Sequence, residues 1–192
     1  MRPISRPFYS RDTVEVAVGL LGKTLVRRIG ELVISGIISE TEAYKSEDDP
    51  ASHSFKGITE RNKAMFGEVG RAYIYFTYGM HYCVNAVARD QICDSGAVLI
   101  RSIIPREGIN FMKKQRKTVD ISNLANGPAK LTQAMRITKS QYGEDMTKVS
   151  RLYITDGIDI KKQDVESKPR IGIKNAKDKL WNFSIRPLSN NY

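Results

Sequence analysis

The chain of 192 residues is long enough to bury one sizeable core and has no internal repeat or long linker, so a single domain over residues 1–192 is expected. No apolar run approaches the length of a membrane span and the N-terminus has no hydrophobic signal segment, which argues against a membrane or secreted protein and favours a cytoplasmic one. The net charge of +10 favours a polyanionic partner, and the whole excess falls in residues 101–192, which carry 19 Lys and Arg against 9 Asp and Glu. We therefore expect the second half to supply a phosphate-binding face; the alternative is a basic surface that only keeps the protein in solution.

The first half of the chain has the pattern of one short helix followed by hairpins. Asp12 can cap a helix that ends at Gly22. Strands are expected over residues 23–28, 32–41, 72–77, 81–87 and 97–104. Tyr78-Gly79 suits a tight turn between the third and fourth of them. The two cysteines, Cys83 and Cys93, are too few for a disulfide scaffold, so reduced thiols are expected.

The second half mixes helices with short strands. Pro105 can start a helix that ends in cations suited to a helix C-terminus, namely Lys113, Lys114, Arg116 and Lys117. Asn126-Gly127-Pro128 leads into another helix, and late strands are expected over residues 170–173 and 180–185. A regular βαβ alternation and a glycine-rich dinucleotide motif are both absent from the sequence. The pattern therefore indicates a mixed α/β domain with hairpins.

The segment over residues 38–54 holds the densest group of reactive side chains. A strand-like run ends in Glu40, Glu42 and Tyr44, and alternate residues of a strand share one face. An acidic loop then leads to His53, the first of two histidines. A carboxylate, an aromatic ring and an imidazole at a strand end suit hydrolysis of a flat substrate. The spacing does not choose between the two glutamates as a general base, and an ordinary solvated carboxylate fits it equally well.

His53 admits more than one interpretation. A single histidine is more often structural than catalytic, and this one could also bind a metal together with Cys83, Cys93 or His81. No close-spaced pair of metal-ligand types supports such a site, so no metal is expected.

The first hairpin is rich in aromatic residues. Tyr73, Tyr75 and Thr77 share one face of its first strand, where tyrosines usually pack half-buried. Tyr78 differs because it lies at the turn, where a large ring contributes little to a core but can enter a base stack as a wedge. Asn85 on the return strand can read a base edge, or it can be a polar side chain that only makes hydrogen bonds within the sheet. Stacking rings, a carboxylate and a basic surface together suggest a base drawn out of nucleic acid and held for reaction.

Several ordered blocks of the sequence carry a family likeness. They are Glu40–Tyr44, Asp49–Phe55, Arg61–Gly67, Tyr73–Asn85, Ala97–Arg101, Asn126–Leu131 and Arg170–Ile173. In these blocks, and in their order, the chain resembles the alkyladenine (3-methyladenine) DNA glycosylase family over roughly residues 10–185.

The resemblance implies a mixed α/β fold around a curved, mainly antiparallel sheet with a protruding β-hairpin. It also implies a monofunctional base-excision repair glycosylase that flips alkylated or deaminated purines, such as 3-methyladenine, out of duplex DNA. Hydrolysis of the N-glycosidic bond would leave an abasic site. The expected partner is duplex DNA with a damaged purine, the expected state is a monomer, and neither a membrane nor a metal or organic cofactor is expected.

The resemblance assigns roles to the matching residues. Glu42, the second glutamate of its block, is the general base. Tyr44, His53 and Tyr75 hold the flipped base, and Asn85 excludes guanine through a clash with its 2-amino group.

Other matches concern the DNA itself. Tyr78 fills the gap that the flipped base leaves in the duplex, and Arg101 lies near the DNA backbone. Thr59, Arg61 and Met65 are weaker matches as DNA contacts, because the loop that precedes them differs from better-known members.

Departures from the family pattern leave one alternative function. Asn182 stands where the family often has arginine, which removes a charge, and Ala129 replaces the usual glycine. The alternative is a non-catalytic nucleic-acid-binding module that retains a base pocket. Glu42 argues against it, because a protein that only binds DNA has no use for a buried carboxylate that repels phosphates.

Overall fold

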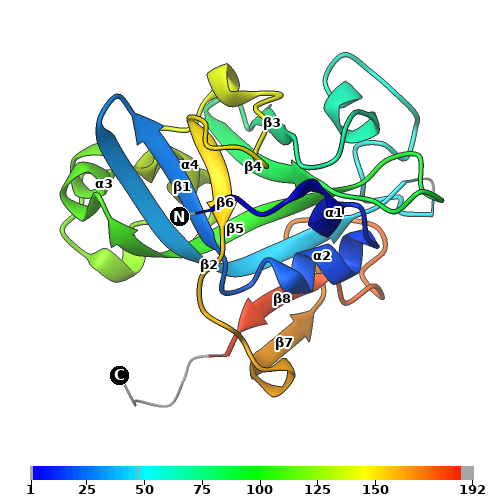
Figure 1. The fold of residues 1–192 in the computed structure, drawn as a ribbon. Coiled ribbons are helices and arrows are strands. Elements are labelled where there is room, and N and C mark those ends of the chain that lie inside the picture. The colour runs from blue at the N-terminus through cyan, green and yellow to red at the C-terminus, as the bar shows by residue number, and fades with distance from the viewer. Residues whose placement is uncertain (1, 47, 187–192) are drawn as a thin grey trace.

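One curved sheet organises the computed structural model, which describes residues 2–46 and 48–186 (Figure 1). Its strands are β1 (Thr24–Ile29), β2 (Leu32–Tyr44), β3 (Ala72–Thr77), β4 (His81–Val87), β5 (Ala97–Glu107), β6 (Leu152–Thr155), β7 (Val165–Lys168) and β8 (Asn182–Ile185). The helices are α1 (Arg6–Tyr9), α2 (Thr13–Gly19), α3 (Ile109–Arg116) and α4 (Pro128–Ala134), with short 3-10 turns η1 (Lys63–Phe66), η2 (Ile121–Asn123), η3 (Lys139–Gln141) and η4 (Lys162–Asp164).

The long strand β2 is the centre of the sheet. The order along the sheet is β3-β4-β5-β2-β1-β6, and all of these pairs are antiparallel. On the side away from β5, β2 pairs first with β1 and then, over its last third, with β8. Its register against β5 shifts on both sides of Glu40. Because such irregularities bend a strand, β2 can pair with two successive partners and the sheet curves. The predicted fold class is confirmed.

Helices pack on this sheet and complete one main core. α2 lies against β2 and β5, α4 lies against β4 and β5, and α3 packs on α4. The apolar side chains of α2 and α4 belong to the same buried cluster as the centres of the strands. A smaller cluster of Met65, Tyr73, Val87 and Ala97 lies apart from it. None of the described helices combines the length and apolar character needed to cross a membrane.

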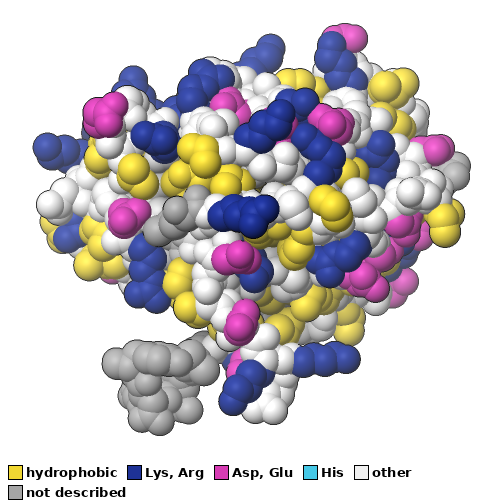
Figure 2. Space-filling model, viewed as in Figure 1, with side chains coloured by type: hydrophobic (Ala, Val, Ile, Leu, Met, Phe, Trp, Pro, Cys, Tyr) yellow, Lys and Arg dark blue, Asp and Glu magenta, His cyan; other side chains and the backbone are white. Residues whose placement is uncertain are grey.

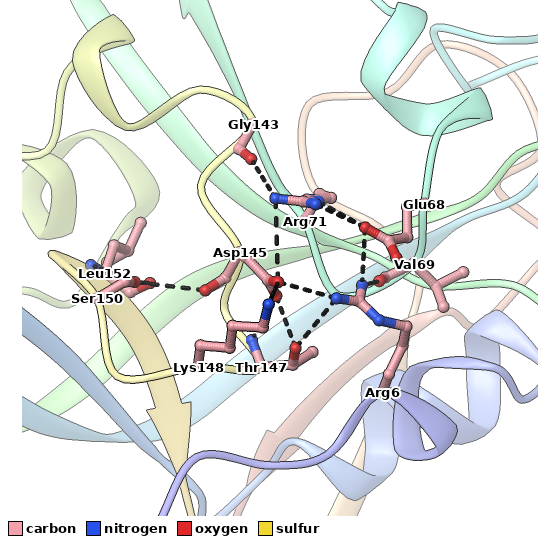
Figure 3. A network of polar contacts seen from close by, with 10 residues as sticks. All are labelled: Arg6, Glu68, Val69, Arg71, Gly143, Asp145, Thr147, Lys148, Ser150 and Leu152. Atoms are coloured by element: carbon pink, nitrogen blue, oxygen red, sulfur yellow. Dashed lines mark hydrogen bonds and ion pairs between the residues drawn. The ribbon is translucent and has the colours of Figure 1, made fainter.

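The N-terminal helix is tied to the sheet by charge. Arg6 on α1 donates to Asp145 at 2.9 Å and pairs with Glu68 at 3.3 Å, and Arg71 pairs with Glu68 at 2.7 Å (Figure 3). Burial opposes the charge of Asp145, but hydrogen bonds from Thr147 and the two arginines outweigh it and lower its pKa. This network joins α1 to the segments that flank the start of β3.

Most of the predicted strands are confirmed, and two are longer than predicted. The third and fourth have the predicted bounds, whereas β2 continues to Tyr44 and β5 to Glu107. Asp12 caps α2 as predicted, by accepting from Val14 and Glu15, although α2 ends at Gly19 rather than Gly22. Cys83 and Cys93 are free thiols.

Two element predictions were wrong. Pro105 lies within β5 opposite Gly36, beside a register shift where its missing N–H is tolerated, and the following helix begins only at Ile109. Residues 170–173 form a turn instead of a strand, because Gly172 has a φ of +76°. The strand of this region is β7, which precedes that turn.

Candidate active site

A cavity of about 570 Å³ lies where β2, β3, β4 and β5 meet the loops of residues 50–53 and 171–175. Most of the predicted site residues line it, namely Glu42, Tyr44, His53, Met65, Tyr75, Tyr78, Asn85 and Arg101. Thr59 and Arg61 are not among the lining residues. Glu42 and Arg101, which are 59 positions apart in the sequence, share this pocket because β2 and β5 pair in the register Glu42↔Leu99.

Glu42 is a fully buried carboxylate held by four donors. Its Oε1 accepts from the Ile171 backbone N–H at 2.7 Å and from Asn182 Nδ2 at 3.0 Å. Its Oε2 accepts from the Tyr44 hydroxyl at 2.8 Å and from Arg101 Nη1 at 3.2 Å. A carboxylate offers about four lone-pair positions, and these four donors match that number. The site therefore holds an anion at a fixed place in the pocket wall.

Glu40 lies beside this anion in a different environment. Its side chain is 20% exposed and does not line the cavity. Its Oε1 accepts from Arg101 Nε at 2.9 Å and from Asn182 Nδ2 at 2.8 Å. Of the two carboxylates that the sequence pattern left open, the geometry therefore brings Glu42 to the pocket.

Arg101 is buried between the two glutamates and is 8% exposed. Burial disfavours its charge, but Glu42 and then Glu40 outweigh burial and raise the pKa of Arg101. The guanidinium thus forms ion pairs with both carboxylates. The expected contact of Arg101 with the DNA backbone stays a prediction.

The opposite wall of the pocket is aromatic. The rings of His53 and Tyr75 meet edge to face with centroids 4.6 Å apart, and His53 Nδ1 lies 2.9 Å from the Tyr73 hydroxyl. Burial, and to a smaller degree the charge of Arg61, lower the pKa of His53. Burial raises the pKa of Tyr44 and of Tyr75. At neutral pH these rings are therefore uncharged and can stack on a flat ligand.

Asn85 is buried and fixed in the floor of the pocket. Its Nδ2 donates to the Tyr73 carbonyl at 2.9 Å, across the β3–β4 pairing. This hydrogen bond sets the orientation of its side-chain amide.

Tyr78 stands at the tip of the β3–β4 hairpin, which is a tight turn as predicted. Its ring is 84% exposed and its φ of +51° is uncommon for a residue with a side chain. Gly79 follows with a φ of +67°, and Met80 is 68% exposed. The tip thus displays apolar side chains at the pocket mouth, where they gain nothing from the core.

The weaker DNA-contact candidates are spread over the loop beside the pocket. Arg61 lies over the Tyr75 ring, 5.4 Å from its centroid, and Met65 is buried in the pocket wall. The Thr59 backbone N–H donates to Asn62, whose own amide ties the loop to the His53 carbonyl. Thr59 therefore stabilises the loop, and the structure does not bring it into the pocket.

Sequence reasoning missed a buried ion pair behind the pocket. Arg170 donates to both oxygens of Asp49 at 2.6 Å, and both side chains are fully buried. The guanidinium also lies 4.7 Å from the Tyr44 ring centroid and 5.1 Å from that of Trp181. The pair fastens the loop that carries Ile171 to the loop that carries His53. Both residues fall in blocks that carry the family likeness, which was the available signal.

Within residues 2–46 and 48–186, no group of three or more His, Cys, Asp or Glu side chains is arranged to hold a metal ion.

Comparison with known proteins assigns the family. A family model described as methylpurine-DNA glycosylase matches residues 7–188. The chain belongs to this family. A protein of Carboxydothermus hydrogenoformans is 44% identical over 183 residues, which are 95% of each chain. Proteins of Clostridium acetobutylicum and Methanocella arvoryzae are 42% and 44% identical and cover 94% and 95% of this chain, or 93% and 92% of their own. All three carry the provisional name 3-methyladenine DNA glycosylase.

Membership of the methylpurine-DNA glycosylase family confirms the resemblance seen in the sequence blocks. The protein is a DNA glycosylase of a family that processes alkylated bases in DNA repair, and DNA is its substrate. The aromatic pocket with its buried carboxylate is the part of the molecule suited to that chemistry.

Proposed function

We propose that this glycosylase flips alkylated and deaminated purines, such as 3-methyladenine, from duplex DNA into the pocket and hydrolyses the N-glycosidic bond. It acts as a monomer and leaves an abasic site without cutting the strand. The observation that carries the proposal is the buried carboxylate of Glu42, held by four donors in the wall of an aromatic cavity. A base cannot reach this depth while it is stacked in a duplex, so it has to be extruded.

The pocket suits a cationic purine. Tyr44 and Tyr75 present faces that attract a positive ring by cation–π interaction, and a neutral His53 does not repel it. Asn85 supplies the amide that disfavours the 2-amino group of guanine. Selectivity also arises before chemistry, because extrusion is easiest for weakly paired lesions.

The reaction follows from the charges. An alkyl group at N3 or N7 places positive charge on the purine, so the bond between C1′ and N9 breaks with its electron pair going to the base, which leaves neutral. The sugar acquires oxocarbenium character, which the carboxylate of Glu42 stabilises. A water molecule that donates to Glu42 in place of one of the four donors attacks C1′ and gives its proton to Glu42. A neutral lesion such as hypoxanthine additionally needs a proton on the leaving base.

A lesion panel tests this function. Duplexes that carry 3-methyladenine, 1,N6-ethenoadenine or hypoxanthine are incubated with the protein, and abasic sites are then cleaved with alkali. We expect strand breaks on lesion duplexes and none on undamaged DNA. Breaks on none of the three duplexes, with lesion binding intact, would instead identify a binding module.

The hairpin tip should contribute to lesion binding and not to folding. Replacing Tyr78 with alanine is expected to weaken binding of lesion duplexes about tenfold, since a stacked ring contributes roughly 1–3 kcal/mol. Binding to undamaged DNA and thermal stability should stay unchanged, because the ring is 84% exposed. The matched control is Val119→Ala, an equally exposed apolar residue in the α3–α4 connection. Unchanged lesion affinity in the Tyr78 variant would exclude the wedge role.

The basic residues at the pocket mouth should dominate phosphate binding. The surface in Figure 2 mixes Lys and Arg with Asp and Glu, so the excess charge does not form one stripe there. Lys174 lines the pocket and Lys177 is exposed in the same loop. The first residues of β5 line the pocket, whereas the cationic helix α3 follows the last residue of β5. This helix lies far from the loop of residues 48–62 (Figure 1).

Neutralising Lys174 and Lys177 together is therefore expected to lower the salt dependence of DNA binding. Each lost phosphate contact should reduce the slope of log K against log salt by about 0.9. The matched variant neutralises Lys113 and Lys114 on α3 and should have a smaller effect. A larger change in the α3 variant would place the phosphate face on α3.

A further inference from the structure

Asn182 lies directly opposite Glu42 on the neighbouring strand. β8 pairs with β2 in the register Glu42↔Asn182, and Asn182 is 2% exposed. Directly paired residues of antiparallel strands point to the same face, with Cβ atoms about 4.5–5.5 Å apart. β8 therefore brings this side chain next to the carboxylate of Glu42.

The amide of Asn182 bridges two carboxylates. Its Nδ2 donates to Glu40 Oε1 at 2.8 Å and to Glu42 Oε1 at 3.0 Å. A primary amide has two N–H groups, so both are used. From the β5 side, Arg101 reaches the same two carboxylates through Nε and Nη1. The two glutamates are thus joined twice, once by a cation and once by a neutral group.

The charges in this group do not cancel. Among the described residues, Arg101 is the cation that pairs with Glu40 or Glu42, so the group of three ionised side chains carries a net charge of −1. Two carboxylates that share one cation repel each other. Asn182 offsets this repulsion with two hydrogen bonds to their oxygens and adds no charge of its own. An arginine at position 182 would make the group neutral.

We propose that Asn182 is a positioning residue for hydrolysis: its amide holds the carboxylates of Glu42 and Glu40 in a fixed orientation while leaving negative charge beside the pocket. The inference rests on the proposed role of Glu42 as the base. The retained negative charge favours a positively charged purine and the oxocarbenium character of the sugar.

The test uses Asn182→Asp, which keeps the size of the side chain, exchanges the donor nitrogen for an acceptor oxygen and adds a third carboxylate. Excision from a 1,N6-ethenoadenine duplex is measured in single turnover, with protein in excess, across a range of pH. At neutral pH the rate is expected to fall roughly 10- to 100-fold, the size of one or two lost hydrogen bonds to a charged group. The acidic limb of the pH profile should move to higher pH, because a third negative charge makes ionisation harder. Affinity for the lesion duplex should not change.

Two further variants complete the experiment. Asn182→Leu removes the donors without adding charge, so its pH profile should move less than that of Asn182→Asp. Asn110→Asp makes the same charge change on exposed α3 and should leave both rate and profile as in the parent protein. Thermal melting of each variant shows the folded fraction, and rates are compared per folded molecule.

The outcomes separate this inference from the proposed function. If Glu42→Gln is inactive while both Asn182 variants retain the parent rate and pH profile, the positioning role is wrong and the role of Glu42 stands. If Glu42→Gln still excises the base, the role of Glu42 is wrong and the inference about Asn182 goes with it. A loss confined to lesion affinity in Asn182→Asp would also overturn the positioning role.

Discussion

Replacing Glu42 with glutamine should abolish excision while lesion DNA still binds. Loss of a positioned general base lowers a rate by about 10²–10⁴-fold. Here the amide also fits badly, because all four neighbours of the carboxylate act as donors. The NH₂ of a glutamine would meet either Tyr44 and Arg101 or Ile171 and Asn182, and one pair of donors would lose its acceptor. We therefore expect the loss of rate to lie at the upper end of this range.

The matched control is Glu40→Gln, which makes the same chemical change two residues earlier in β2, on the other side of a register shift. Glu40 is partly exposed and outside the cavity, so its variant should lose far less activity than Glu42→Gln. Single-turnover excision and equilibrium binding of the same lesion duplex are measured for both variants. Substantial turnover by Glu42→Gln, or a greater loss in Glu40→Gln, would show that the base is misassigned.

The sequence predicted the features that depend on neighbours in the chain. Runs rich in Tyr, Ile and Val located β3 and β4, and an aromatic residue next to glycine located the hairpin tip. Asp12 predicted the start of α2 through a hydrogen bond to residues two and three positions away. The short cluster of Glu42, Tyr44 and His53 pointed to the pocket for the same reason, since it lies in one strand and the loop that follows.

The sequence did not predict features that depend on distant pairing. The choice between Glu40 and Glu42 rests on the bulge in β2 and on β8, which is about 140 positions away in the chain. Asn182 first counted only as a lost charge, although its amide contacts both glutamates. Pro105 was misassigned because tolerance of proline in a strand depends on a register shift that no local pattern reveals.

The ion pair of Asp49 and Arg170 supports the second large expected effect, which is on stability. Replacing Asp49 with asparagine leaves the Arg170 guanidinium fully buried without its partner. Loss of one member of such a pair costs about 3–5 kcal/mol, a large part of the 5–15 kcal/mol that usually stabilises a domain. The Asp49→Asn variant should therefore melt at a much lower temperature and lose most of its excision activity.

The neighbouring pair of Asp48 and Lys179 provides the control, because it joins the same two loops at the surface. These side chains are 62% and 22% exposed, and exposed pairs contribute at most about 1 kcal/mol. Asp48→Asn should thus change the free energy of unfolding little, as measured by chemical denaturation. Equal losses in the two variants would mean that burial does not set the strength of the Asp49 pair.

A double variant separates stability from function at this pair. Replacing Asp49 with leucine and Arg170 with methionine removes both charges, and apolar substitution of a whole buried pair is often neutral or stabilising. We expect this variant to recover much of the lost stability but not the activity. Without the guanidinium, no side chain at position 170 donates to the Ala43 carbonyl or ties the Ile171 loop to the loop of residue 49, so the Ile171 N–H is no longer held against Glu42. Full activity in a stable double variant would show that the pair only supports folding.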